Sequence, residues 1–185
     1  MNIRWSLFLG AIALVLLGWL ATNGGNEPTV PAPVQGDPSF WGNNMLTVVY
    51  DPTGKLHYKL VSTKVKYYAE NGNTDFSQPL MTLYSAEGIP IWMVQAKDAV
   101  LTKDKMLYLK GDVEVNSLTP DSQLEKLETT QATINLTTQD ITSDTKVTVY
   151  GANFTSVGLK MRGNLRNRTA ELQEQVKSYY EIKKP

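Results

Sequence analysis

Few residues of this 185-residue chain combine the type and the spacing that catalysis requires. Asp112 and Glu114 lie two positions apart in a stretch of alternating residues, so both carboxylates would leave the same face of a β-strand. A pair of this kind could act as the acid and the nucleophile of a glycosidase. The same pair could simply solvate the outer face of a strand, and we expect this second role.

The other candidate groups are also weak. His57 is the only histidine, and its neighbours alternate as in a strand, so we expect a satisfied or exposed strand histidine. The absence of cysteine excludes a thiolate metal site, a disulfide and a cysteine nucleophile. We predict no catalytic residue, no metal site, no cofactor and no enzymatic activity. Four aspartates in or near turns could ligate calcium, but they lack the signature of a calcium-binding loop: Asp98, Asp104, Asp140 and Asp144.

The charge balance argues against nucleic acid as a partner. Eighteen basic and eighteen acidic residues give a net charge of zero, and the chain contains no long run of Lys or Arg. Binding of nucleic acid depends largely on clustered cations that neutralise phosphates. We therefore expect no nucleic-acid partner.

Alternation with a period of two is the dominant pattern of the chain. In "MLYLKGDVEVN", Met106 to Asn116, every second residue from Leu107 to Val115 is apolar or glycine, and the residues between them are mostly polar. Successive side chains leave a strand on opposite faces, so this pattern predicts a half-buried strand. The apolar face must pack against a core or against a ligand.

Similar segments follow one another from Met45 onward, separated by turn sequences such as "DPTG", "SAEG" and "SLTPDS". Strand-to-hairpin passages recur about every 33 to 35 residues, a spacing typical of stacked repeats, at Val65 to Tyr67, Ala99 to Leu101 and Ala132 to Leu136. Strands at this spacing predict an all-β sandwich, jelly roll or barrel.

The N-terminus predicts a membrane anchor. No charged residue occurs from Trp5 to Ala21, just after Arg4, which is enough for one membrane-spanning helix. The positive-inside rule places the N-terminus in the cytoplasm and the remaining chain outside. A cleaved signal peptide is the alternative, but Trp19 makes a cleavage after Ala21 unfavourable. We predict an anchor at residues 1–22, a Pro/Gly-rich linker at 23–44 and one β-domain at 45–185.

The last segment, "TAELQEQVKSYYEI", fits a strand or a helical stripe. A strand would align Ala170, Leu172, Val176 and Tyr180 on one face, and we prefer it because the alternation continues through the paired tyrosines. A strand at the end of a chain is a natural sheet edge, which can accept a strand from another protein.

Taken together and in this order, several segments resemble the LptC family of lipopolysaccharide export proteins of Gram-negative bacteria. They are the N-terminal anchor, "MLYLKGDVEVN", "TPDSQL", "TINLTTQDITSD", "VYG" and "GLKMRGNLR". The resemblance implies a single N-terminal transmembrane helix followed by a periplasmic antiparallel β-jelly roll that is open along one side. It also implies a protein that receives lipopolysaccharide and holds the acyl chains in the interior of the jelly roll.

The resemblance further implies two protein partners. An inner-membrane transporter, made of an ATPase dimer and two membrane subunits, would meet the N-terminal edge and the anchor. The periplasmic bridge protein LptA would meet the C-terminal edge, to which we assign Ala170, Leu172, Val176 and Tyr180. The inward faces that we assign to lipid are Phe76, Leu80, Tyr84, Trp92, Val94, Leu107, Leu109, Val115, Ile134, Leu136, Val147 and Val149.

Two other classes of function remain open. A structural adaptor could join the transporter to the bridge protein by strand pairing alone and never touch lipid. A carbohydrate-binding jelly roll could use exposed aromatic rings such as those of Trp41, Tyr67 and Tyr68 as stacking platforms.

Overall fold

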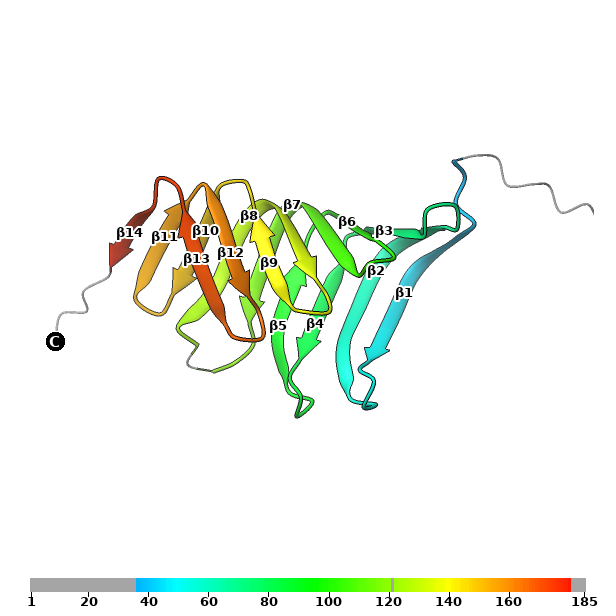
Figure 1. Ribbon diagram of the computed structural model, residues 1–185, viewed down its shortest axis with the longest axis horizontal. Coiled ribbons are helices and arrows are strands. Elements are labelled where there is room, and N and C mark those ends of the chain that lie inside the picture. Colours follow the sequence, from blue (N-terminus) through cyan, green and yellow to red (C-terminus); the bar gives the residue numbers. More distant parts are fainter. Residues whose placement is uncertain (1–35, 121, 181–185) are drawn as a thin grey trace, which may run out of the picture. The chain divides into compact units, whose positions relative to one another are not determined.

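The computed structural model of the chain describes residues 36–120 and 122–180, and all regular structure in these residues is β-strand (Figure 1). The predicted anchor and the first part of the linker lie outside this range. Within the described residues, there is no helix with the length and hydrophobicity of a membrane span. β1 begins at Phe40 rather than near Met45, because Phe40 to Asn43 pair with Lys64 to Tyr67 of the long strand that follows.

Fourteen strands form one continuous antiparallel sheet. The first seven are β1 (Phe40–Tyr50), β2 (Leu56–Tyr68), β3 (Asn73–Ser77), β4 (Leu80–Tyr84), β5 (Pro90–Gln95), β6 (Asp98–Leu101) and β7 (Met106–Ser117). The others are β8 (Leu124–Asn135), β9 (Asp140–Ser143), β10 (Val147–Gly151), β11 (Phe154–Gly158), β12 (Lys160–Asn164), β13 (Thr169–Gln173) and β14 (Lys177–Tyr180). The all-β antiparallel prediction is therefore confirmed, and the arrangement is that of a jelly roll.

Every pass of the chain bends or breaks near its middle, and the bends lie side by side. They fold the sheet into two layers. Layer 1 contains β3, β6, the first half of β7, the second half of β8, β9, β12 and β13; layer 2 contains β4, β5, the other halves of β7 and β8, β10, β11 and β14. The long strands β1 and β2 run through both layers at one end.

We call the row of bends the bend line, and hydrogen bonds run along it from one bend to the next. The Gln78 amide donates to the Lys97 carbonyl (2.7 Å), and the Lys97 amide donates to the Gly111 carbonyl (2.8 Å). Gly111 has a φ of 78° and Asp112 a φ of 44°, so β7 turns through a bulge where two residues leave the regular ladder. The bend line therefore forms one closed side of the jelly roll.

Two buried hydroxyl groups occupy matching places on the bend line. In β2, the Ser62 hydroxyl lies 2.8 Å from the Lys64 carbonyl and 2.7 Å from the Ser77 carbonyl of β3. In β8, the Thr129 hydroxyl donates to the Lys146 carbonyl (3.0 Å), just before β10. Each buried hydroxyl thus has a backbone carbonyl at the bend as its hydrogen-bond acceptor.

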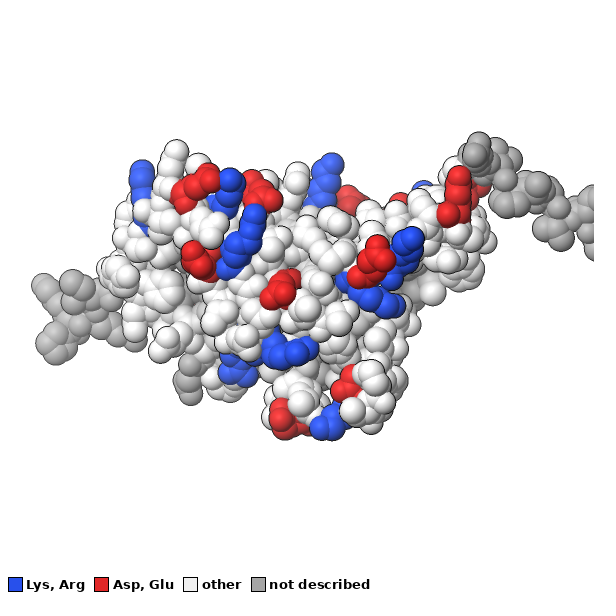
Figure 2. Space-filling model, viewed as in Figure 1, with Lys and Arg blue, Asp and Glu red and all other residues white. Residues whose placement is uncertain are grey.

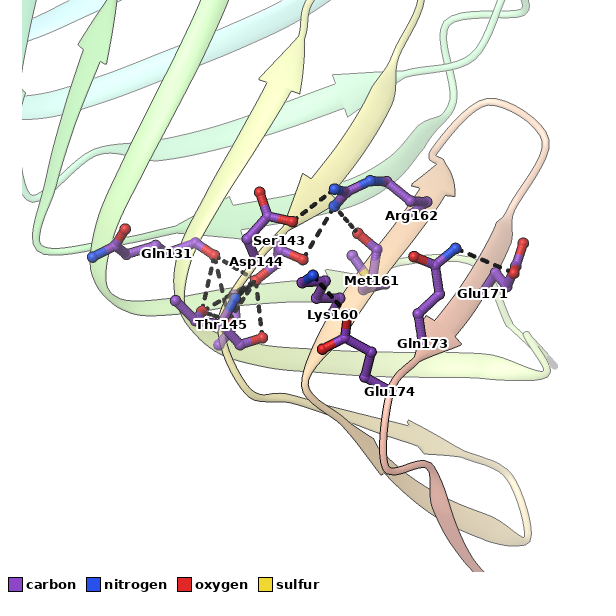
Figure 3. Close-up of polar contacts among 11 residues, drawn as sticks. Gln131, Ser143, Asp144, Thr145, Lys160, Met161, Arg162, Glu171, Gln173 and Glu174 are labelled. Atoms are coloured by element: carbon purple, nitrogen blue, oxygen red, sulfur yellow. Dashed lines mark hydrogen bonds and ion pairs between the residues drawn. The ribbon is translucent and has the colours of Figure 1, made fainter.

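The C-terminal part of the bend line carries a cluster of polar contacts (Figure 3). The Ser143 hydroxyl donates to the Gln131 carbonyl (2.8 Å), so the bends of neighbouring passes are tied together. Ion pairs join Arg162 to Asp144 and Lys160 to Glu174, each at 2.6 Å, on the solvent side. Such exposed pairs contribute little to stability, so the buried hydroxyl contacts matter more.

Thr129→Val should destabilise the domain by about 1–3 kcal/mol, because it removes the hydrogen bonds of a buried hydroxyl to Ser143, Thr145 and the Lys146 carbonyl at an almost unchanged side-chain volume. Urea unfolding of the variant measures the loss. Thr130→Val, at the exposed neighbouring position, is the matched control and should change the free energy of unfolding by less than about 0.5 kcal/mol. Equal stability of the two variants would contradict this assignment.

Candidate functional site

The interior between the two layers is apolar and continuous. One cluster of buried hydrophobic side chains extends from Tyr58 in β2 to Met161 in β12. Ten of the residues that we assigned to lipid lie in it, each no more than 5% exposed: Phe76, Trp92, Val94, Leu107, Leu109, Val115, Ile134, Leu136, Val147 and Val149. The apolar face of "MLYLKGDVEVN" thus faces the space between the layers.

Leu80 does not share this face, and the prediction of its inward orientation was wrong, whereas Tyr84 follows a register shift after Leu83 and lines a cavity beside the interior. Leu80 is 37% exposed and Tyr84 is half-buried. Gln78 has a φ of 49°, and this break between β3 and β4 shifts the alternation by one residue. Met81 and Leu83, each 1% exposed, are the inward residues of β4.

The side of the jelly roll opposite the bend line is where the hairpin tips of the two layers meet. In Figure 1 the β8–β9 and β12–β13 hairpins of layer 1 and the β1–β2 and β4–β5 hairpins of layer 2 all end on this lower side. The gap between these tips, which we call the mouth, contains a cavity of about 930 Å³. Its apolar walls include Tyr58, Ile91 and Leu136.

Two hydrogen bonds bridge the mouth. The ring of His57 in layer 2 lies 3.1 Å, Nε2 to Nε2, from the amide of Gln139 at the β8–β9 tip. The indole of Trp92 in layer 2 donates to the carbonyl of Leu165 at the β12–β13 tip (2.7 Å). Both layer 1 residues are 4% exposed, so these two tips are folded inward over the core. The two bonds therefore join the layers across the mouth.

Sequence reasoning missed both tip residues. Gln139 is polar and follows the turn sequence "TT", and Leu165 is one apolar residue between polar ones, so neither belongs to an alternating run. Their burial depends on a partner strand that is far away in the sequence, 82 residues for His57 and Gln139. The one local signal is the φ of 63° at Gln139, which is a backbone property and cannot be read from residue type.

The bridging histidine makes stability depend on pH. Burial lowers the pKa of His57 below its usual 6.5, Arg166 lowers it further, and Asp51 opposes the shift. The unfolded chain therefore binds this proton more readily, and the stabilising contribution of neutral His57 is present above pH 6.5 and is lost as the pH falls below it.

We expect His57→Asn to remove this part of the pH dependence. Urea unfolding at closely spaced pH values between 5 and 8 should show a slope in the native chain that is smaller in the variant. Thr63→Asn, an exposed change in the same strand, is the control and should keep the native slope. Parallel pH profiles for all three chains would be the contrary result.

The C-terminal end of the jelly roll is less well closed. A cavity of about 660 Å³ lies between the ends of the two layers, and its lining includes Val149, Phe154, Ala170, Leu172 and Val176. Three of the residues that we assigned to the docking edge therefore border this cavity. The fourth, Tyr180, is 74% exposed and lies 6.3 Å from Phe154, measured between ring centroids.

The C-terminal segment forms strands rather than a helix, but it is not one strand. Glu174 and Gln175 have φ values of 59° and 52°, which end β13 before Val176. The two resulting strands belong to different layers, because β13 pairs with β12 and β14 pairs with β11. Among the described strands, β13, β14 and β1 each pair on one side only, so each layer ends in an exposed edge.

The carboxylates that could imitate a catalytic pair have structural partners. Asp112 forms an ion pair with Lys97 (2.8 Å), and Glu114 accepts a hydrogen bond from Gln95 (2.9 Å). Within the described range, no three His, Cys, Asp or Glu residues are grouped as metal ligands would be. The arrangement provides an apolar interior with exposed sheet edges, and this suits binding rather than catalysis.

Comparisons with known proteins agree with this architecture. A family model described as "Lipopolysaccharide-assembly, LptC-related" matches residues 8–181. The lipopolysaccharide export system protein LptC of Escherichia coli K12 is 43% identical over 179 residues, covering 97% of this chain and 94% of that protein. The protein of the same name from Haemophilus influenzae Rd is 41% identical, covering 100% of this chain and 97% of that protein.

A solved structure shares the fold. LptH of Pseudomonas aeruginosa, described as the LptA-homologous periplasmic component of the lipopolysaccharide transport device, superposes with a TM-score of 0.57. The match covers 68% of this chain and 95% of that one at 9% identity, so it speaks to the fold alone. The family model and the two relatives, by contrast, match nearly the whole chain, and the chain therefore belongs to the LptC family of lipopolysaccharide-assembly proteins.

Proposed function

We propose that this chain receives lipopolysaccharide from an ATP-driven inner-membrane transporter, holds its acyl chains between the two layers and passes it to the periplasmic protein LptA. Membership of the LptC family supports a role in lipopolysaccharide transport. The observation that carries the finer proposal is the continuous apolar interior, which reaches from the mouth to the cavity at the C-terminal end.

The energetics explain why such an interior would be needed. Burying one acyl chain of about a dozen carbons is worth on the order of 10 kcal/mol, at about 0.8 kcal/mol per CH₂ group. A lipid with several chains cannot cross water at that cost. Apolar side chains along consecutive strands would replace the bilayer, and docked jelly rolls would extend the path.

The buried residues listed above for the interior are the proposed lipid contacts, with Met81 and Leu83 in place of Leu80. Tyr84 borders the cavity at the mouth and would contact lipid there. Because these side chains are closely packed, the two layers must separate before acyl chains can enter. The two hydrogen bonds across the mouth are the contacts that separation would break first.

The remaining parts of the chain take roles at the two ends. Residues 1–22 would anchor the protein in the inner membrane with the N-terminus in the cytoplasm, and residues 45–185 would lie in the periplasm. β1 would extend a sheet of the transporter, while β13 and β14 would extend the two layers into LptA. The chain contains no glycine-rich phosphate loop, so the energy for transport would come from the transporter.

Photo-crosslinking tests the lipid path. A photoreactive amino acid at Leu136 or Val149, both buried and both lining a cavity, should form a lipopolysaccharide adduct in vesicles that contain the transporter. The adduct should increase when ATP is added. The matched control is Asp112, whose side chain is 74% exposed on the bend line, and it should form none.

The structural adaptor is the second candidate, and the tight packing of the interior favours it. Trp92, 1% exposed, fills the space between the layers and is held by the Leu165 carbonyl. An adaptor would assemble with the transporter and LptA and give no adduct at either interior position. The carbohydrate-binding alternative rests on Trp41, which is 60% exposed on β1, and would require binding of delipidated sugar.

A further inference from the structure

The hairpin tips of layer 1 share a backbone feature that their sequences do not explain. The last residue of each tip has a positive φ: Gly72 (72°), Lys105 (62°), Gln139 (63°) and Arg168 (55°). Glycine adopts this conformation freely, whereas a side chain makes it unfavourable by roughly 1–2 kcal/mol. Three tips nevertheless carry a long polar side chain at this position, and the side chains of all three line the mouth.

One of these side chains already has an identified partner, because Gln139 contacts His57. Lys105 and Arg168 are exposed, and Arg166 joins them on the β12–β13 tip with one hydrogen bond to the Thr137 carbonyl (3.3 Å). The ion pairs found among the described residues involve other lysines and arginines. Layer 1 therefore presents three cations to the mouth that have no carboxylate within ion-pair distance in the described part of the chain.

The acidic residues of the opposite rim are engaged in their own turns. The Asp51 carboxylate accepts hydrogen bonds from the Thr53 hydroxyl (2.6 Å) and from the amides of Thr53 (2.8 Å) and Lys55 (2.9 Å). A hydrogen bond from Ser85 likewise lowers the pKa of Glu87. Figure 2 shows basic side chains below the ends of the layer 1 hairpins, facing the mixed charges of the layer 2 tips. The two rims thus differ: layer 1 offers free cations, and layer 2 offers carboxylates that already have donors.

We propose that Lys105, Arg166 and Arg168 form a binding subsite for the phosphate groups of a phosphorylated lipid whose acyl chains enter the mouth. The cavity combines this cationic rim with the apolar walls of Tyr58, Ile91 and Leu136, which matches an anionic headgroup joined to acyl chains. Arginine suits phosphate because its planar guanidinium can donate two parallel hydrogen bonds. The inference rests on the proposed lipid function and assigns its headgroup recognition.

Binding of two lipids to the full-length chain in nanodiscs tests the subsite. The probes are diphosphoryl lipid A and the same lipid after enzymatic removal of both phosphates. The triple variant Lys105→Gln, Arg166→Gln, Arg168→Gln should bind diphosphoryl lipid A about tenfold or more weakly than the native chain. Both chains should bind the dephosphorylated lipid equally. Lys110→Gln, on the outer face of β7, is the control and should bind as the native chain does.

The outcomes separate this inference from the proposed function. Equal loss of both lipids in the triple variant, or no loss of either, would overturn the phosphate subsite while the lipid function stands. If inorganic phosphate binds the native chain as strongly as diphosphoryl lipid A does, the rim is a free-anion site and the lipid assignment fails. If the native chain binds neither lipid, both the proposed function and this inference are overturned.

Discussion

Joining residues 57 and 139 by a short covalent cross-link should reduce lipopolysaccharide transfer to the level measured without the protein. These residues lie on opposite sides of the mouth, and their side chains meet at 3.1 Å. If acyl chains enter by separation of the two layers, a covalent bridge at this point prevents entry. We expect the variant His57→Cys, Gln139→Cys, treated with a short bis-maleimide, to show the loss in a vesicle assay with transporter, ATP and LptA.

The chain has no cysteine of its own, so the introduced pair alone reacts. A bis-maleimide is preferable to a disulfide because two side chains that meet at their tips leave the Cα atoms too far apart for an S–S bond. The untreated double variant should still transfer lipid. Cross-linking Tyr108→Cys to Thr133→Cys, neighbours in β7 and β8 away from the mouth, is the matched control. Full transfer by the chain bridged at the mouth would rule out entry between these tips.

Removing Thr169 to Pro185 should abolish binding to LptA and preserve the complex with the inner-membrane transporter. The deletion takes away β13 and β14, which end layer 1 and layer 2 at the C-terminal side. An added strand gains its affinity mainly from main-chain hydrogen bonds, and these need an unpaired edge in the right register. A pull-down with tagged LptA and a parallel pull-down with the transporter measure both interactions.

The deletion also uncovers Met161, which is fully buried beside Leu172, so thermal unfolding must show that the shortened domain folds. Two milder single variants, Ala170→Pro and Glu171→Pro, each remove one backbone amide of β13. Neighbouring amides of a strand point to opposite edges, so one proline spares the pairing with β12 and removes an outward donor. The single variant whose proline replaces the outward amide should keep the native melting temperature and bind LptA about tenfold more weakly. Retained binding after the full deletion would show that docking uses another edge.

Much of the fold could be predicted from local pattern, because alternation reports burial directly where a strand is regular. Leu107, Leu109 and Val115 were assigned to the interior correctly for this reason. The repeat at Val65, Ala99 and Ala132 also has a structural basis. Each is a buried residue that follows a bend, and one period corresponds to one passage of the chain across both layers and back.

The alternation continues through the two-residue bulge of β7, but it shifts at other crossings of the bend line, and the errors lie there. Leu80 follows the break at Gln78, and Val176 follows the break at Glu174 and Gln175. Gln78, Glu174 and Gln175 have positive φ values without being glycine, so the residue types do not predict the break. The contacts across the mouth could not be predicted for a different reason, since they join segments that only the folded sheet brings together.

The bend line has a mechanical consequence for how the interior can open. Because the backbone of one bend is hydrogen-bonded to the next, from Gln78 through Lys97 to Gly111, neighbouring strand passes cannot tilt independently about it. If the interior opens, each layer would rotate as one body about the bend line. Widening the gap between the layers at one strand pass would then widen it at the next pass. If the interior holds lipid as proposed, lipid near β2 would lower the work needed to admit lipid beside β7, so this part of the passage would fill cooperatively.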